Sequence, residues 1–275
     1  MQKLTSRAPH YRLELKTYGE PHKPQVILLH GIATSSIIWQ KLVGELSSNH
    51  HVVVLDLLGH GRSPKPTNIS YTAQIQAQSI HYTLAINGLL HPSIMIGFSI
   101  GALIATRFSA MYPDLVESLV VAAPPIYQQK TIDHRRLLDR SYQVLYSALA
   151  KLPKKATLKT TASLRRRTPQ LMGKNRLCEE TWHPIFSSLA HTVQEQSFSQ
   201  DIQCLNHRTK IHFLYGTFDH LVIAKHIHAV ADSRSQTHIK KILAPHAITS
   251  RYVKAISQTV HEISSQTLLV SGSAY

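Results

Sequence analysis

The chain of 275 residues has few cysteines, few acidic residues and no long hydrophobic run. Its two cysteines, Cys178 and Cys204, are too few for a disulfide framework and lack the spacing of a metal site. No stretch approaches the roughly 18 consecutive apolar residues of a membrane span. The first seven residues lack the apolar core of a signal peptide. We therefore expect a cytoplasmic protein with reduced thiols, and the composition implies neither a metal nor an organic cofactor.

The shortage of acidic residues leaves 15 Asp and Glu against 30 Lys and Arg, a formal net charge of +15. Residues 127–200 hold 13 basic and 5 acidic residues, a net of 13 − 5 = +8, and three consecutive arginines at 165–167 form the densest cluster. A solvated helical face explains such a cluster. Attraction to an anionic acyl substrate or to a lipid headgroup surface is the alternative. Nucleic acid is disfavoured because aromatic residues are scarce around the cluster.

Short apolar runs alternate with segments of helical spacing, which predicts an α/β fold. The sheet should be mainly parallel, flanked by helices on both sides, with active residues at the carboxyl ends of its strands. The expected strands are 11–18 (a half-exposed edge strand), 25–29, 52–56, 93–96, 116–123, 210–215 and about 237–243. The expected helices are about 36–46, 73–89, a segment after residue 101, 223–231 and 249–269.

This alternation stops at about residue 127 and resumes at about residue 205. The segment between is polar, mostly helical in pattern, and contains a single glycine, Gly173. We therefore expect residues 1–126 and 205–275 to form one α/β core. Residues 127–204 are expected to form a helical insertion.

The pentapeptide from Gly97 to Gly101, Gly-Phe-Ser-Ile-Gly, lies between an apolar strand and a helix. Gly-x-Ser-x-Gly in that context is a nucleophile elbow, a sharp turn that exposes the serine, here Ser99. The two glycines remove the Cβ atoms that would clash in so tight a turn. The helix that follows directs its first amides at the reacting centre, and the amide of Ile100 can hold an oxyanion.

In these features the chain resembles the α/β-hydrolase family. The resemblance covers roughly residues 10–126 and 205–270, and the intervening segment corresponds to the variable cap of that family. Five motifs occur in the expected order: His30-Gly31, Gly59-His60-Gly61-Arg62-Ser63, the elbow, Gly216-Thr217-Phe218-Asp219, and His246.

A serine hydroxyl is a weak nucleophile and needs a base, which in turn needs a carboxylate to fix its tautomer. Asp219 follows a strand 219 − 99 = 120 residues beyond Ser99, and His246 lies 246 − 219 = 27 residues further on. The order Ser, Asp, His is the one expected on this fold. The oxyanion amides would then be those of Ile32 and Ile100.

Each assignment has a structural alternative, because Ser99 and Asp219 could simply cap helices. His246 is one of 19 histidines, and Ala244-Pro245 precede it where the family commonly has glycine. The rival histidines are His220, His238 and His261.

Three further residues near the expected site are assigned structural roles. His30 and His60 lie in loops, where such side chains more often brace neighbouring segments than transfer protons. Asp56 ends a strand, and in this family that position usually supports the following loop.

The expected function is hydrolysis of an ester, thioester or lactone through an acyl-enzyme. Epoxide hydrolases and haloalkane dehalogenases are disfavoured, because they use a carboxylate where Ser99 stands. Ile100 and Ala247 replace the tryptophans usual in proline iminopeptidases and in carbon–carbon bond hydrolases, which lowers the odds of both without excluding them. A non-catalytic binding protein that uses the basic segment is the alternative from another class. Substrate identity and oligomeric state do not follow from the sequence.

Overall fold

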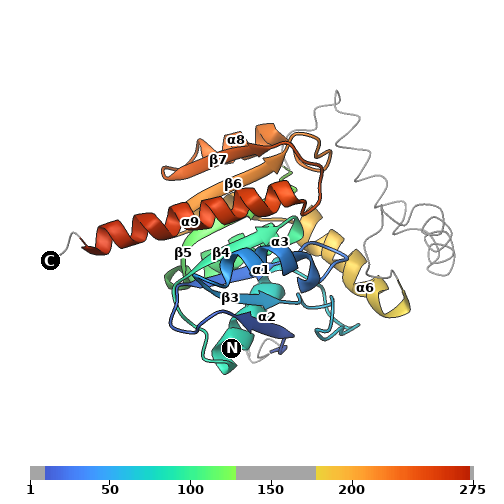
Figure 1. Ribbon diagram of the computed structural model, residues 1–275. Helices are drawn as coiled ribbons and strands as arrows, with labels where there is room; N and C mark the ends of the chain where they lie inside the picture. Colours follow the sequence, from blue (N-terminus) through green and yellow to red (C-terminus); the bar gives the residue numbers. More distant parts are fainter. Residues whose placement is uncertain (1–9, 128–177, 273–275) are drawn as a thin grey trace, which may run out of the picture.

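A computed structural model describes residues 10–127 and 178–272 of the chain (Figure 1). Seven strands form one sheet in the order β1-β3-β2-β4-β5-β6-β7. β1 pairs antiparallel with β3, and every other neighbouring pair is parallel. The strands are β1 (Leu15–Tyr18), β2 (Gln25–Leu29), β3 (His51–Leu55), β4 (Ser93–Phe98), β5 (Val116–Ala122), β6 (Lys210–Gly216) and β7 (Thr237–Ile242). The predicted α/β class and mainly parallel sheet are confirmed.

The central strands form because their apolar runs are covered on both faces. Every residue of β2, β3 and β4 is buried. The edge strand β1 begins at Leu15, whereas alternation predicted a start at residue 11. The difference has a physical cause, since the Leu13 and Glu14 amides donate to the side chains of Thr83 and Ser63 instead of to a strand.

Helices cover both faces of the sheet. α1 (Gln40–Leu46) and α9 (Ser250–Gly272) lie side by side on one face, over a core that includes Trp39 and Tyr252 (Figure 1). The opposite face is covered by α2 (Ala73–Ile86), α3 (Ile100–Met111), α7 (Phe198–Cys204) and α8 (Ala224–Ala231). Short 3₁₀ helices in the described residues are η1 (Ser36–Trp39) and η2 (Pro113–Leu115).

Helix boundaries differ slightly from the predicted ones. The predicted helix at 36–46 is η1 followed by α1. α2 begins where the Thr72 side chain accepts a hydrogen bond from the Ile75 amide. It ends at Ile86, three residues earlier than predicted, because Gly88 takes a left-handed φ of 67°.

The structure describes residues 127 and 178–204 of the predicted insertion, and most of residues 178–204 are helical. They form α6 (Glu179–Ser188), the π-helix η3 (Leu189–Gln194) and α7. The arginines at 165–167 lie outside the described residues. Among the helices that are described, none is both long and apolar enough to cross a membrane.

The parallel strands direct their carboxyl ends to one edge of the sheet. The loops that follow β2, β4, β5 and β6 leave from that edge, and the loop after β7 leaves there too. Residues that lie far apart in the sequence therefore meet at this edge.

Candidate active site

Ser99 stands in a strained turn between β4 and α3. Its φ of 56° and ψ of −122° lie outside the regions that residues with a side chain usually adopt. The Ser99 amide donates to the Ala122 carbonyl of β5 at 2.9 Å, which fixes the turn to the neighbouring strand. A Cβ on Gly101 would lie 2.5 Å from the carbonyl oxygens of Leu29 and His30, so only glycine fits there. The backbone conformation is that of the predicted elbow, but the Ser99 residue is 7% exposed, so the turn does not expose it to solvent as predicted.

Ser99, His246 and Asp219 form a continuous hydrogen-bonded chain. The Ser99 Oγ lies 2.9 Å from His246 Nε2, and His246 Nδ1 lies 2.7 Å from Asp219 Oδ2. The second carboxylate oxygen of Asp219 accepts from the Leu221 amide at 2.9 Å. A carboxylate accepts only, so Nδ1 is the donor and Nε2 is left to accept the serine proton. The donors and acceptors are thus arranged as in a serine–histidine–aspartate triad.

The three rival histidines lie elsewhere. His220 is exposed and directly follows Asp219, whose carboxylate is instead bonded to His246 and Leu221. His238 on β7 stacks on His212 of the neighbouring strand β6. The ring of His261 lies beside that of His50. The loop geometry after Ala244-Pro245 therefore still delivers the His246 ring to Ser99.

The two candidate oxyanion amides belong to segments that converge on Ser99. Ile100 is the first residue of α3, so its N–H lies at the helix start, where amides lack an intrahelical acceptor. The loop that carries Ile32 passes against the nucleophile, since a Cβ on Gly31 would lie 3.4 Å from Ser99 Cβ. Neither amide donates to another backbone carbonyl within the described part of the chain.

The histidine ring is supported by aromatic side chains that the sequence did not single out. The Phe98 ring lies 5.2 Å from that of His246, and Tyr252 meets Phe98 edge-on at 5.9 Å. Burial raises the pKa of the Tyr252 phenol, and the charge of Asp219 adds to the effect. Tyr252 is therefore protonated and neutral, and its ring packs against Phe98.

His30 braces two loops, as the sequence predicts. Its Nδ1 lies 2.7 Å from the Gly31 carbonyl, and its Nε2 accepts from the Leu57 amide at 2.9 Å. Burial lowers the pKa of His30 to about 4, so the ring is neutral at pH 7. His60 is equally buried, and its pKa is lowered to about 3. Neither ring contacts Ser99 through a hydrogen bond within the described residues.

Asp56 anchors the loop that follows β3. Its two carboxylate oxygens accept from the amides of Ser36 at 2.7 Å and Arg62 at 2.8 Å. Burial by itself would raise the pKa of Asp56, but these amides outweigh burial and lower it. The predicted supporting role is confirmed.

Sequence reasoning missed the amide of Leu221 and the strain at two alanines. The bond from Leu221 to Asp219 is an Asx turn, for which an aspartate two residues earlier is the available signal. Ala33 and Ala123, in loops beside the elbow, have φ values of 52° and 49°. Alanine gives no sequence signal for such a left-handed conformation. Among the described residues, no cluster of three or more His, Cys, Asp or Glu side chains could hold a metal ion.

The chain is similar in sequence to known proteins. The chain is 29% identical over 111 residues to "Probable lysophospholipase BODYGUARD 2" of Arabidopsis thaliana, covering 38% of this chain and 24% of that protein. It is 32% identical over 148 residues to "Epoxide hydrolase 3" of Mus musculus, covering 52% of this chain and 40% of that protein. The matched segments thus span well under half of these relatives' own length.

Solved structures share the fold. The enol-lactonase from Burkholderia xenovorans LB400 superposes with a TM-score of 0.73 at 16% identity, covering 93% of this chain and 97% of that one. The bromoperoxidase from Bacillus anthracis superposes with a TM-score of 0.71 at 18% identity, covering 91% and 94%. The model of the alpha/beta hydrolase fold family matches residues 24–247, most of the chain. The chain therefore belongs to the alpha/beta hydrolase fold family.

Proposed function

We propose that the protein is a serine hydrolase that cleaves an ester, thioester or lactone through an acyl-enzyme. The observation that carries the proposal is the hydrogen-bonded chain from Ser99 Oγ through His246 to Asp219, with distances of 2.9 and 2.7 Å. His246 Nε2 takes the proton of Ser99 as the hydroxyl attacks the substrate carbonyl. Asp219 keeps Nδ1 protonated and stabilises the imidazolium that forms.

The tetrahedral intermediate carries a negative oxygen that needs hydrogen-bond donors. The amides of Ile32 and Ile100 are proposed to supply them, because both belong to segments that converge on Ser99. His246 then returns its proton to the leaving group, and a water activated by the same ring releases the acid. Removing one such donor typically costs about 10²–10³ in turnover.

The identity of the nucleophile disfavours epoxide hydrolysis, which is the activity named for one of the relatives. One relative is named an epoxide hydrolase. Such enzymes use a carboxylate at the nucleophile position, where this chain has Ser99. The names lysophospholipase and enol-lactonase among the similar proteins fit a serine acting on an ester or lactone carbonyl. The ester class is therefore preferred.

The division of the chain into a core and a cap is part of the proposal. β5 and β6 are paired neighbours in the sheet, so residues 127–204 are an insertion between adjacent strands. In its described part, Ser187 and Thr192 bond the backbone of Tyr71 next to the loop of Gly59. We propose that residues 127–204 form a helical cap over a core of residues 1–126 and 205–275.

Active-site labelling tests the proposal. The wild-type protein and Ser99→Ala are incubated with a fluorescent fluorophosphonate and assayed with p-nitrophenyl esters of several acyl lengths. Ser63→Ala is the matched control, because Ser63 is also a buried serine but bonds the Asp56 carbonyl and the Glu14 amide. We expect labelling and turnover in wild type and in Ser63→Ala, and neither in Ser99→Ala.

The remaining alternatives make different predictions in the same experiment. A non-catalytic binding protein would neither label nor turn over any ester. A carbon–carbon bond hydrolase or an iminopeptidase would label at Ser99 but leave the esters intact, and a vinylogous diketone or a prolyl anilide would then be the substrate class to test. Turnover that persists in Ser99→Ala would overturn the proposed mechanism.

A further inference from the structure

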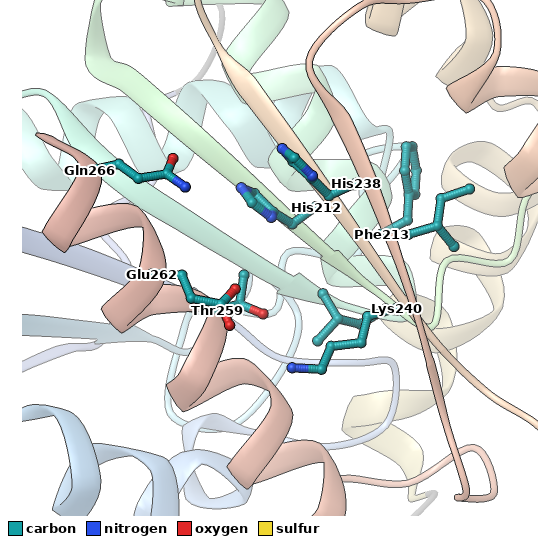
Figure 2. A pocket seen from close by; sticks show the side chains of 9 residues that line it. His212, Phe213, His238, Lys240, Thr259, Glu262 and Gln266 are labelled. Atoms are coloured by element: carbon teal, nitrogen blue, oxygen red, sulfur yellow. The ribbon is translucent and has the colours of Figure 1, made fainter.

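A groove lined by both polar and apolar residues lies between α9 and the strands β6 and β7 (Figure 2). Its volume is about 400 Å³. The polar side chains that line this histidine groove are those of His212, His238, Lys240, Thr259, Glu262 and Gln266. The histidines lie near the amino ends of β6 and β7, whereas Asp219 and His246 follow the carboxyl ends of the same strands. The groove is therefore separate from the candidate active site.

The groove interrupts an apolar pattern. Where α9 covers the sheet, β6 and β7 present the buried apolar side chains of Leu214 and Ile242. Two residues earlier on each strand, on the same face, His212 and Lys240 take their place, and a sheet face covered by a helix is ordinarily apolar there. A local departure from such a pattern is expected at functional sites.

The two histidines form a stacked pair on neighbouring strands. His212 and His238 are opposite each other in the parallel register, with ring centroids 4.8 Å apart and planes 16° apart. Figure 2 shows both rings on the side of the strands that faces Gln266 and Glu262 of α9. His212 is 8% exposed, and its Nε2 is buried without a hydrogen-bond partner among the described residues. A ligand that forms a hydrogen bond with this ring would offset the free-energy cost of burying Nε2 without a partner.

The electrostatics of the groove favour a negative ligand. Lys240 and Lys210 bond the neutral amide oxygens of Gln258 at 3.1 Å and Gln266 at 2.8 Å, so neither charge is neutralised by those partners. Glu262 is the acidic side chain in the lining. Burial, with the charges of His238 and Lys210, lowers the pKa of His212 to about 4, so its ring is neutral at pH 7 and can still donate one hydrogen bond.

We propose that the histidine groove binds a small organic anion whose carboxylate or phosphate group accepts hydrogen bonds from His212 and Lys240. The charges of Lys240 and Glu262 balance within the lining. The neighbouring Lys210, which bonds the lining residue Gln266, adds one positive charge that attracts an anion. The exposed His238 ring offers a flat face to an aromatic or other planar part of the ligand. Because the groove is separate from Ser99, this proposal does not depend on the proposed catalytic activity.

Histidine-ring NMR on the full-length protein tests the proposal. The ring signals of His212 and His238 are assigned with His212→Gln and His238→Gln, and the protein is titrated at pH 7 with benzoate and, separately, with inorganic phosphate. We expect saturable shifts of both signals, with benzoate binding more tightly if the planar ring contributes. Lys240→Gln should weaken binding at least about threefold, since it removes one charge contact.

Lys241→Gln is the matched control, because it removes the same charge from the adjacent position, whose side chain points to the other face of β7. It should leave the affinity unchanged, and Glu262→Gln should increase it. Should His212→Gln fail to fold, the comparison of Lys240 with Lys241 remains decisive. The absence of shifts at about 10 mM of either anion, or equal weakening by both lysine variants, overturns the proposal. Shifts caused by Zn²⁺ alone would replace it with a metal site.

Discussion

The two ends of β6 and β7 use histidine in opposite ways. At the carboxyl end, both ring nitrogens of His246 are bonded, one to Ser99 and one to Asp219. At the amino end, the ring of His212 is buried with an unpartnered nitrogen, stacked on His238. A ring with both partners in place is organised for one proton transfer. A ring with an unpartnered nitrogen is suited to bind a ligand, as we propose for His212.

The largest effect is expected from removing the fully bonded ring. We expect His246→Ala to lower kcat/KM for a p-nitrophenyl ester by on the order of 10⁵-fold or more, because Ser99 loses its base. His238→Ala, which removes an exposed ring from the other end of β7, should leave kcat/KM within about twofold. Equal losses in the two variants would show that activity depends on general stability and not on the bonded ring.

The second largest effect is expected at the carboxylate. Asp219→Asn should lower kcat by on the order of 10⁴-fold, because an amide stabilises the wrong tautomer of His246. The free energy of unfolding should change far less, since the Leu221 amide can still bond the remaining oxygen. Urea denaturation measured beside the kinetics separates the two effects. A variant that keeps more than a tenth of wild-type activity would contradict the assigned role.

A third prediction concerns the backbone of the elbow. Gly101→Ala should lower the free energy of unfolding by about 2–4 kcal/mol, because its Cβ would meet two carbonyl oxygens of the β2 end. Gly44→Ala is the matched control. Gly44 is exposed in α1 with no atom within 4 Å of a new Cβ, so alanine should stabilise by about 0.5–1 kcal/mol. Thermal or urea unfolding of both variants measures the difference.

The smallest expected effect is the contribution of His212 to the pH dependence of the free energy of unfolding. Burial lowers the pKa of His212 from 6.5 to about 4, so between these values the unfolded chain binds the proton and the folded chain does not. The free energy of unfolding should therefore fall as pH drops from 7 to 5. Over the same pH interval, the free energy of unfolding of His212→Leu should fall by about 2 kcal/mol less than that of the wild type. His30 and His60 add falls of the same sign in both proteins.

Urea denaturation at pH 7 and pH 5 measures this difference, with His238→Leu as an exposed control. A pH dependence that is identical in wild type and His212→Leu would show that His212 is not the group that titrates. At pH 7, His212→Leu should be neutral or stabilising, since an apolar side chain replaces a buried polar atom without a partner.

Most strands could be predicted because their signal is local. Continuous apolar runs define β2 and β3, and the glycines around Ser99 define the elbow. The order of Ser99, Asp219 and His246 in the sequence sufficed to nominate the residues that the structure brings together. Whether they act as proposed stays a prediction, as do the cytoplasmic location and the absence of a cofactor.

The remaining features depend on register and on side-chain contacts that no local pattern encodes. The stacking of His212 on His238 requires the alignment of two strands that are 26 positions apart (238 − 212). The contact of Phe98 with His246 depends on the conformation of the loop that follows β7. The basic cluster at 165–167 lies outside the described residues, so its attraction to an anionic substrate or membrane stays a prediction.

The distance in sequence between Ser99 and His246, 147 positions, has a consequence for the chain during its synthesis. At about 5–20 residues per second, a ribosome needs roughly 7–30 s to reach His246 after Ser99 has been added. Throughout that interval the nascent chain carries the serine without its base, and α9, which completes one face of the core, is still unmade. The proposed acyl-transfer chemistry therefore requires the last part of the chain to be synthesised and folded.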